Sequence, residues 1–179
     1  MKRINFFWLL GLIFLLGCNK DSLLDQTIQP SEEGVVSLRS AFVPFKGDET
    51  TVSVSRTDVG NIRTIIFEGG GNATHLGKFT SRFTQIVDLT TPSLFTGSAI
   101  LTAANNDQLF YDYEGSIVID FPNLSFTGEI GFTFTGGTGR FVDAEGSGTA
   151  ISTGVFPDFP PDPDEALTID ITYEGKISY

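Results

Sequence analysis

Hydrophobic and polar residues alternate with a period of two along much of the chain, most clearly near its C-terminal end. Over residues 167–179 the apolar positions are Leu167, Ile169, Ile171, Tyr173, Ile177 and Tyr179. The intervening polar positions are Thr168, Asp170, Thr172, Glu174, Lys176 and Ser178. This alternation is typical of a β-strand with one buried face and one solvated face.

The same alternation recurs in shorter runs, and clusters of turn-forming residues separate these runs. Gly69–Asn72, Thr91–Ser93, Asn105–Asp107 and Gly136–Gly139 are rich in Gly, Asn, Asp or Pro, which favour tight turns. The pattern predicts eight strands, near residues 36–47, 62–70, 75–88, 95–104, 107–120, 125–135, 146–156 and 166–179. Residues 50–60 are predicted to be a connection with room for a short extra strand.

Short connections between strands favour antiparallel neighbours. A long antiparallel series has to protect its edges, and eight strands are enough to close a small barrel. We therefore predict an all-β fold, with residues 35–179 forming an eight-stranded antiparallel closed barrel. Which face of each strand points inward stays open at this point, because interior and exterior positions alternate in the same way.

Composition supports a packed β domain and disfavours one class of partner. The 179 residues include 17 Phe and 20 Gly, with 40% hydrophobic and 18% charged residues. The formal net charge of −11 repels phosphate backbones, so we predict no nucleic-acid partner.

The first residues have the pattern of a bacterial lipoprotein signal. Lys2 and Arg3 precede an apolar run over residues 4–16, which is too short to span a bilayer as a mature helix. The run ends in Leu15-Leu16-Gly17-Cys18, which resembles a lipobox, in which the Cys is acylated and the chain is cut before it. An ordinary secretory signal with an incidental Cys is the alternative. We predict a signal peptide over residues 1–17 and lipidation at Cys18.

A lipidated Cys18 predicts a membrane-anchored protein of the bacterial cell envelope, on the outer-membrane, periplasmic or surface side. Cys18 is the only Cys, so no intramolecular disulfide forms and no thiol is left for catalysis. Residues 18–34 are polar and mixed, and we interpret them as a flexible tether between the acyl chains and the barrel.

The segment Phe156–Glu165 combines four prolines with four acidic residues, which are Asp158, Asp162, Asp164 and Glu165. Oxygen ligands of this kind bind Ca²⁺, but the spacing lacks the glycine and terminal Glu of the usual calcium loop. A solvated acidic loop is therefore the preferred interpretation, and we predict no metal site.

Standard catalytic motifs do not occur in the sequence: there is no GxSxG, HExxH, phosphate-binding GxxxxGK[ST] or GxGxxG unit. We predict no catalytic residue set and no cofactor. His75 and Arg82 are the candidate ligand-binding residues, His75 because it is expected at a barrel rim. The alternatives are a structural His75 that binds a backbone carbonyl and a surface Arg82 or Arg140 that pairs with an acid.

Gly136-Gly137-Thr138-Gly139-Arg140-Phe141, followed by Ala144 and Gly146, is similar to the turn of the allene oxide cyclase and dirigent barrel superfamily. The segments 74–80 and 101–105 resemble bacterial secreted proteins that share this barrel. The resemblance covers residues 62–179 and implies an eight-stranded antiparallel barrel, often with an apolar interior. It assigns a structural role to Gly136–Gly146 and transfers no activity, because fold analogy alone does not establish function.

Three functions remain open. The leading hypothesis is a non-catalytic barrel that binds a small apolar or amphiphilic molecule or an envelope partner. The second is an enzyme of the cyclase or isomerase type, and the third is a structural or adhesive envelope protein. An open apolar cavity would favour the first two, whereas an interior filled with side chains would favour the third.

Overall fold

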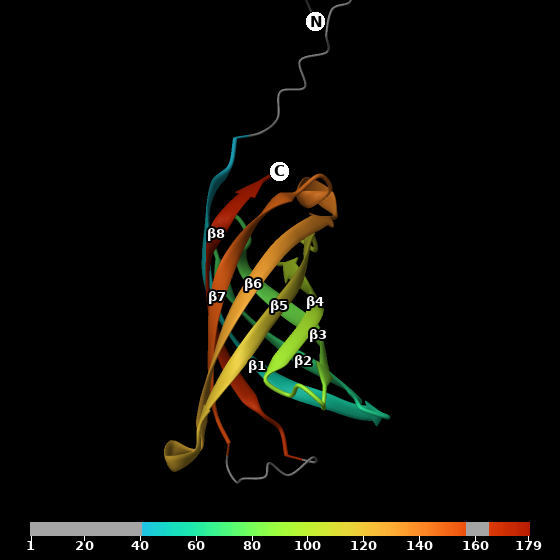
Figure 1. Cartoon of the computed structure of the whole chain (residues 1–179). Coiled ribbons are helices and arrows are strands. Elements are labelled where there is room, and N and C mark those ends of the chain that lie inside the picture. Colours follow the sequence, from blue (N-terminus) through green and yellow to red (C-terminus); the bar gives the residue numbers. More distant parts are fainter. Residues whose placement is uncertain (1–40, 157–164) are drawn as a thin grey trace, which may run out of the picture. The chain divides into compact units, whose positions relative to one another are not determined.

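The computed structural model describes residues 41–156 and 165–179, which form a closed antiparallel β-barrel (Figure 1). Its strands are β1 (Val43–Val59), β2 (Ile62–Ala73), β3 (Gly77–Asp88), β4 (Leu94–Ala103), β5 (Gln108–Asp120), β6 (Ser125–Gly137), β7 (Glu145–Val155) and β8 (Thr168–Ser178). Two 3-10 turns complete the described part, η1 (Phe121–Asn123) and η2 (Gly139–Phe141). None of its helical segments has the length and apolar character needed to cross a membrane.

Several predictions lie outside the described residues. These are the signal peptide over residues 1–17, the tether over 18–34 with Cys18, and residues 157–164 of the acidic segment.

Each strand pairs antiparallel with the next one in sequence, and β8 pairs with β1 to close the barrel. The closing ladder runs from Val43 opposite Ile177 to Val52 opposite Thr168. The predicted eight-stranded antiparallel barrel is therefore confirmed. Both neighbours of every described strand lie within the compact unit Leu38–Tyr179, which also holds the buried core, so the ladders and the core of the barrel belong to one unit.

The prediction for the first strand was wrong. Residues 50–59 are not a connection, because they continue β1 (Val43–Val59), and the predicted start of the strand at residues 36–40 lies outside the described residues. The inward positions in the middle of β1 are Gly47, Glu49 and Thr51, and the last two are buried at 3% and 1% exposure. A polar inner face hides the usual alternation, so the strand resembled a loop in the sequence.

The glycine cluster at residues 69–71 was also interpreted wrongly as a turn. It lies inside β2, and the chain reverses at residues 74–76, with His75 in the turn at a φ of 69°. At Gly71 a Cβ atom would lie 1.8 Å from the Asp48 carbonyl oxygen of β1. Glycine is therefore required there by the close approach of two backbones rather than by a reversal of the chain.

The barrel interior differs between its two ends. At the end where β1 begins and β8 ends, the upper end in Figure 1, several large side chains are fully buried in the interior; we name this the closed end. Its fully buried residues include Phe45, Leu101, Leu109, Phe141 and Ile177, each at 0–1% exposure. Phe141 is the aromatic residue that follows the 136–139 turn, and it packs into this end from η2.

Candidate functional site

The other half of the barrel contains a cavity of about 180 Å³. It extends from Tyr111 and Tyr173 near the middle to the end that carries the β1–β2 and β3–β4 turns, which we name the open end. The lining is mainly aromatic and aliphatic, and includes Ile65, Phe67, Phe83, Val87, Phe95, Tyr113, Phe126, Ile130, Phe156, Ile169 and Ile171. A cavity of roughly 150 Å³ with similar apolar walls holds one benzene-sized molecule. The space therefore fits a small apolar body.

A hydrogen-bonded chain of polar side chains forms the inner end of the cavity. The Tyr111 and Tyr173 hydroxyl oxygens lie 2.9 Å apart, and the Tyr173 hydroxyl donates a hydrogen bond to Oε1 of Glu49. Glu49 is 3% exposed, and its Oε2 has no hydrogen-bond partner in the described part of the chain. Because Tyr173 lines the cavity, its hydroxyl connects the cavity to the buried carboxyl group.

Burial raises the pKa of the Glu49 carboxyl group to about 7, although the hydroxyls of Ser81 and Tyr173 lower it in part. The Ser81 hydroxyl is near enough to favour the charged carboxylate but forms no hydrogen bond in the described residues. Burial also raises the pKa of Tyr111 and Tyr173 well above its ordinary value, so both stay protonated. Glu49 can therefore gain or lose a proton near neutral pH, as a general acid or base must.

Two arginines, Arg56 and Arg63, contribute to the lining at the open end. Arg63 binds Asp58 through two hydrogen bonds, Nε to Oδ1 at 2.9 Å and Nη2 to Oδ2 at 2.8 Å. The hydrogen bonds from Arg63 hold the pKa of Asp58 below its usual value. Two positive charges and one negative charge therefore meet at the entrance.

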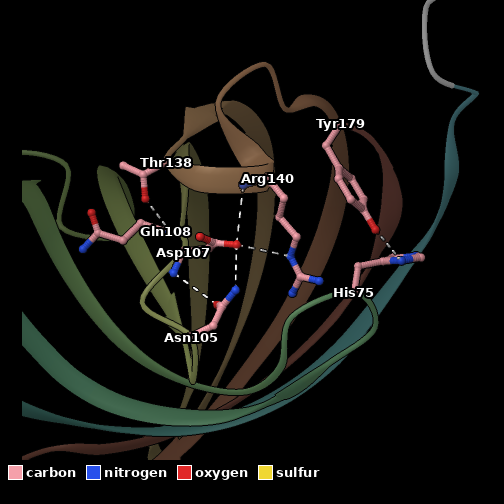
Figure 2. A network of polar contacts seen from close by, with 7 residues as sticks. All are labelled: His75, Asn105, Asp107, Gln108, Thr138, Arg140 and Tyr179. Atoms are coloured by element: carbon pink, nitrogen blue, oxygen red, sulfur yellow. Dashed lines mark hydrogen bonds and ion pairs between the residues drawn. The ribbon is translucent and has the colours of Figure 1, made fainter. Parts of the chain in front are cut away.

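His75, the first predicted ligand-binding residue, lies at the closed end (Figure 2). Its Nε2 lies 3.0 Å from the Pro44 carbonyl oxygen and its Nδ1 lies 3.0 Å from the Tyr179 hydroxyl. A carbonyl only accepts, so Nε2 donates to it, and in the neutral ring Nδ1 accepts from Tyr179. The bond to a backbone carbonyl is the one expected of a structural histidine.

His75 is distant from the cavity entrance. Arg63 is near the start of β2 and His75 follows its end, and a strand of 12 residues is about 40 Å long. The cavity lining does not include His75.

The remaining polar contacts at the closed end join its loops (Figure 2). Asp107 Oδ2 accepts from Asn105 Nδ2 at 2.8 Å and lies 3.7 Å from Arg140 Nε, while Thr138 Oγ1 accepts from the Gln108 backbone N–H at 2.9 Å. These contacts link the β4–β5 turn to the 136–141 segment. They stabilise the loops over the filled half of the barrel.

Arg82, the second predicted ligand-binding residue, faces outward from β3. It forms an ion pair with Glu68 on the neighbouring strand β2, and the two side chains are 52% and 49% exposed. The cavity lining does not include Arg82. The structure therefore places both candidate residues away from the cavity and in contacts with neighbouring side chains or backbone.

The sequence did not identify Glu49 or Arg56 as candidate site residues, and it indicated Tyr173 only as an apolar strand position. Glu49 and Arg56 fall in or beside the segment that was interpreted as a connection, so neither was assigned an inward face. One signal was available: Thr50, Thr51, Val52 and Val54 are β-branched, and this density favours a strand.

In residues 41–156 and 165–179 no group of three or more His, Cys, Asp or Glu side chains has an arrangement that would hold a metal ion. Comparison of the chain with models of protein families, with curated proteins and with solved structures found no match.

Proposed function

We propose that this protein is a lipid-anchored β-barrel of the bacterial cell envelope that binds a small apolar or amphiphilic molecule inside the barrel. The observation that carries the proposal is the cavity of about 180 Å³ with aromatic and aliphatic walls and a few polar groups at its two ends. Ligand sites typically combine apolar walls with a small number of placed polar groups. The lipobox-like Cys18 supports the envelope location.

We also propose that the barrel is of the allene oxide cyclase and dirigent type. Eight antiparallel strands in sequential order and the Gly136–Gly139 turn, followed by a buried Phe141 and Ala144, support this assignment. An experimental structure compared with that superfamily by strand tilt and stagger would test it.

Native mass spectrometry of residues 38–179 tests the binding function. Protein purified from a heterologous host should carry an additional mass that organic extraction removes. Ile130 lines the cavity, so Ile130→Trp should fill it and abolish the additional mass. The control is Ile100→Trp, since Ile100 is 40% exposed and absent from the lining. A bare polypeptide mass, unchanged after incubation with lipid mixtures, would instead favour the structural or adhesive function.

One observation favours an enzyme of the cyclase or isomerase type as a second candidate. Glu49 has a pKa near 7 and is joined by a hydrogen bond to Tyr173 in the cavity wall. If the site performs acid–base chemistry, Glu49→Gln should be purified with a substrate, whereas the natural protein carries its product. Chromatography of the two extracts would then separate different compounds or isomers, and identical extracts would contradict catalysis.

A further inference from the structure

A β-bulge in β1 determines which way Arg56 points. In the β1–β2 ladder Ser53 lies opposite Phe67 and Ser55 lies opposite Ile66, so Val54 is an extra residue without a partner. Unbroken alternation from the inward Thr51 would place residue 56 on the outer face. The extra residue reverses the alternation, and Arg56 lies opposite the inward Ile65 and lines the cavity. Bulges frequently redirect a side chain beside a functional site.

The two arginines at the open end differ in their partners. Arg63 is held by both carboxylate oxygens of Asp58. Arg56 forms no ion pair or hydrogen bond with another side chain of the described residues, although its charge acts on Asp58 and helps to lower the pKa of that carboxyl group. The Nε atom of Arg56 is buried without a hydrogen-bond partner there. An arginine side chain keeps its charge under all ordinary conditions. Arg56 therefore offers a charged donor group to whatever enters the cavity.

The guanidinium group of Arg56 favours a carboxylate as the polar group of a bound molecule. The planar guanidinium group matches a carboxylate through two parallel hydrogen bonds, and a neutral alcohol or an ammonium group gains no such pairing. The chain as a whole has a net charge of −11, which repels anions at long range. Any preference for an anion must therefore come from a local group such as Arg56.

The cavity beyond Arg56 limits the rest of the ligand. Its walls include the rings of Phe67, Phe83, Phe95 and Phe126, and its volume is about 180 Å³. Aromatic walls favour edge-to-face contacts with another ring. A body of one substituted ring fits this space.

We propose that the natural ligand is a small carboxylate with an apolar body of single-ring size, and that Arg56 binds its carboxylate at the open end. The proposal rests on the binding function proposed above and specifies the chemical class of the ligand. In this orientation the apolar body points toward Tyr111 and Tyr173.

Titration calorimetry of residues 38–179 with three compounds that share one body tests the proposal. The compounds are 3-phenylpropanoate, 3-phenylpropan-1-ol and protonated 3-phenylpropylamine. We expect the carboxylate to bind at least tenfold more tightly than the alcohol, and the ammonium compound to bind most weakly. Equal or tighter binding of the alcohol would overturn the proposal, and this measurement needs no variant.

Variants then assign the preference to Arg56. Arg56→Gln should reduce the carboxylate-to-alcohol affinity ratio to about one while leaving alcohol binding unchanged, and Arg56→Lys should restore part of it. Arg82→Gln is the matched control, because Arg82 faces outward, and should leave the ratio unchanged. An unchanged ratio in Arg56→Gln would overturn the role of Arg56 while the cavity function stands. If none of the three compounds binds and no additional mass is found, the proposed function fails as well.

Discussion

At the scale of single residues, the burial of the Glu49 carboxyl group is energetically unfavourable. Its carboxyl group is buried, and only one of its oxygens accepts a hydrogen bond in the described residues. Burying an ionised carboxylate carries a large desolvation penalty, and the group responds by holding its proton to higher pH. Ionisable groups with strongly shifted pKa values cluster at functional sites, and Tyr173 links Glu49 to the cavity.

This placement predicts a pH-dependent stability. The pKa of Glu49 is about 7 in the folded protein and 4.5 for an ordinary glutamate, so between these values the folded state binds the proton and the unfolded state does not. The free energy of unfolding therefore falls as pH rises from 4.5 to 7, by on the order of 3 kcal/mol for this group.

Glu49→Gln removes the titrating group while an amide oxygen still accepts from Tyr173. Urea unfolding of both proteins at pH 4.5 and pH 8 should show a larger loss of stability in the natural protein, by that amount. If the stability of the two proteins depends on pH in the same way, the pKa of Glu49 is not raised in the folded protein.

At the scale of elements, β1 has the most unusual construction. It is paired with β8 only as far as Val52, whereas its ladder with β2 continues through the bulge to Val59. The bulge therefore lies in the part of β1 that has a single ladder. Because of this position, the bulge changes which residues of β1 face inward after Val54 and leaves the β1–β8 ladder that closes the barrel intact.

Deletion of Val54 should consequently be tolerated. The β1–β2 ladder would become regular, the β1–β8 ladder would keep its register and Arg56 would still face inward, so we expect a loss of about 1 kcal/mol in the free energy of unfolding. Deletion of Asp48, which is paired on both sides and lies several residues before the bulge, would turn either the start of β1 or Glu49 and Thr51 to the wrong face and cost more than about 4 kcal/mol. Thermal unfolding followed by circular dichroism compares the two deletions. Equal losses would contradict this account of the bulge.

The same strand shows what the sequence was able to predict. Seven strands were located to within a few residues, most of them because their inward faces are apolar, as in β8 with Ile169, Ile171 and Tyr173. In β1 the inward Glu49 and Thr51 remove the apolar signal, and the bulge at Val54 then interrupts the period. The polar residues of β1 that contribute to the candidate site therefore also removed the sequence pattern by which the strand is recognised.

His75 lies at a barrel rim as predicted, but the sequence did not show that this rim is at the closed end or that His75 is itself in the turn. Its turn was placed at the glycines of residues 69–71, yet these glycines serve a close contact between strands, as Gly71 shows. Local composition does not distinguish a glycine that reverses the chain from one that makes room for a neighbouring backbone. That distinction depends on pairing between distant segments.

At the scale of the whole molecule, the barrel interior is packed at one end and hollow at the other. The closed end is filled by residues such as Phe45 and Phe141, whereas the open end leaves a cavity with charged groups at its entrance. A half-filled barrel keeps a large core and still offers space to a ligand.

The proposed lipid anchor gives a prediction for the whole molecule. Expressed from its own signal in a bacterial host, the natural chain should fractionate with membranes, and Cys18→Ser should move it into the soluble fraction, since the attached acyl chains provide the binding. Immunoblots of separated fractions measure the distribution. The barrel variant Arg82→Gln serves as the control and should remain with the membranes. A Cys18→Ser protein that stays in the membrane fraction would contradict lipidation as the anchor.

Closure of the barrel by the β1–β8 ladder also restricts how a macromolecule can recognise this domain. Many partners bind by β-augmentation, adding a strand of their own to an exposed sheet edge and gaining main-chain hydrogen bonds. In the described barrel both neighbours of each strand are present, so this mode is limited to short stretches with a single ladder, such as β1 beyond Val52. Outside these stretches, another protein has to recognise the folded barrel by side chains of the outer face or by the loops, which gives the recognition a specificity that strand addition lacks.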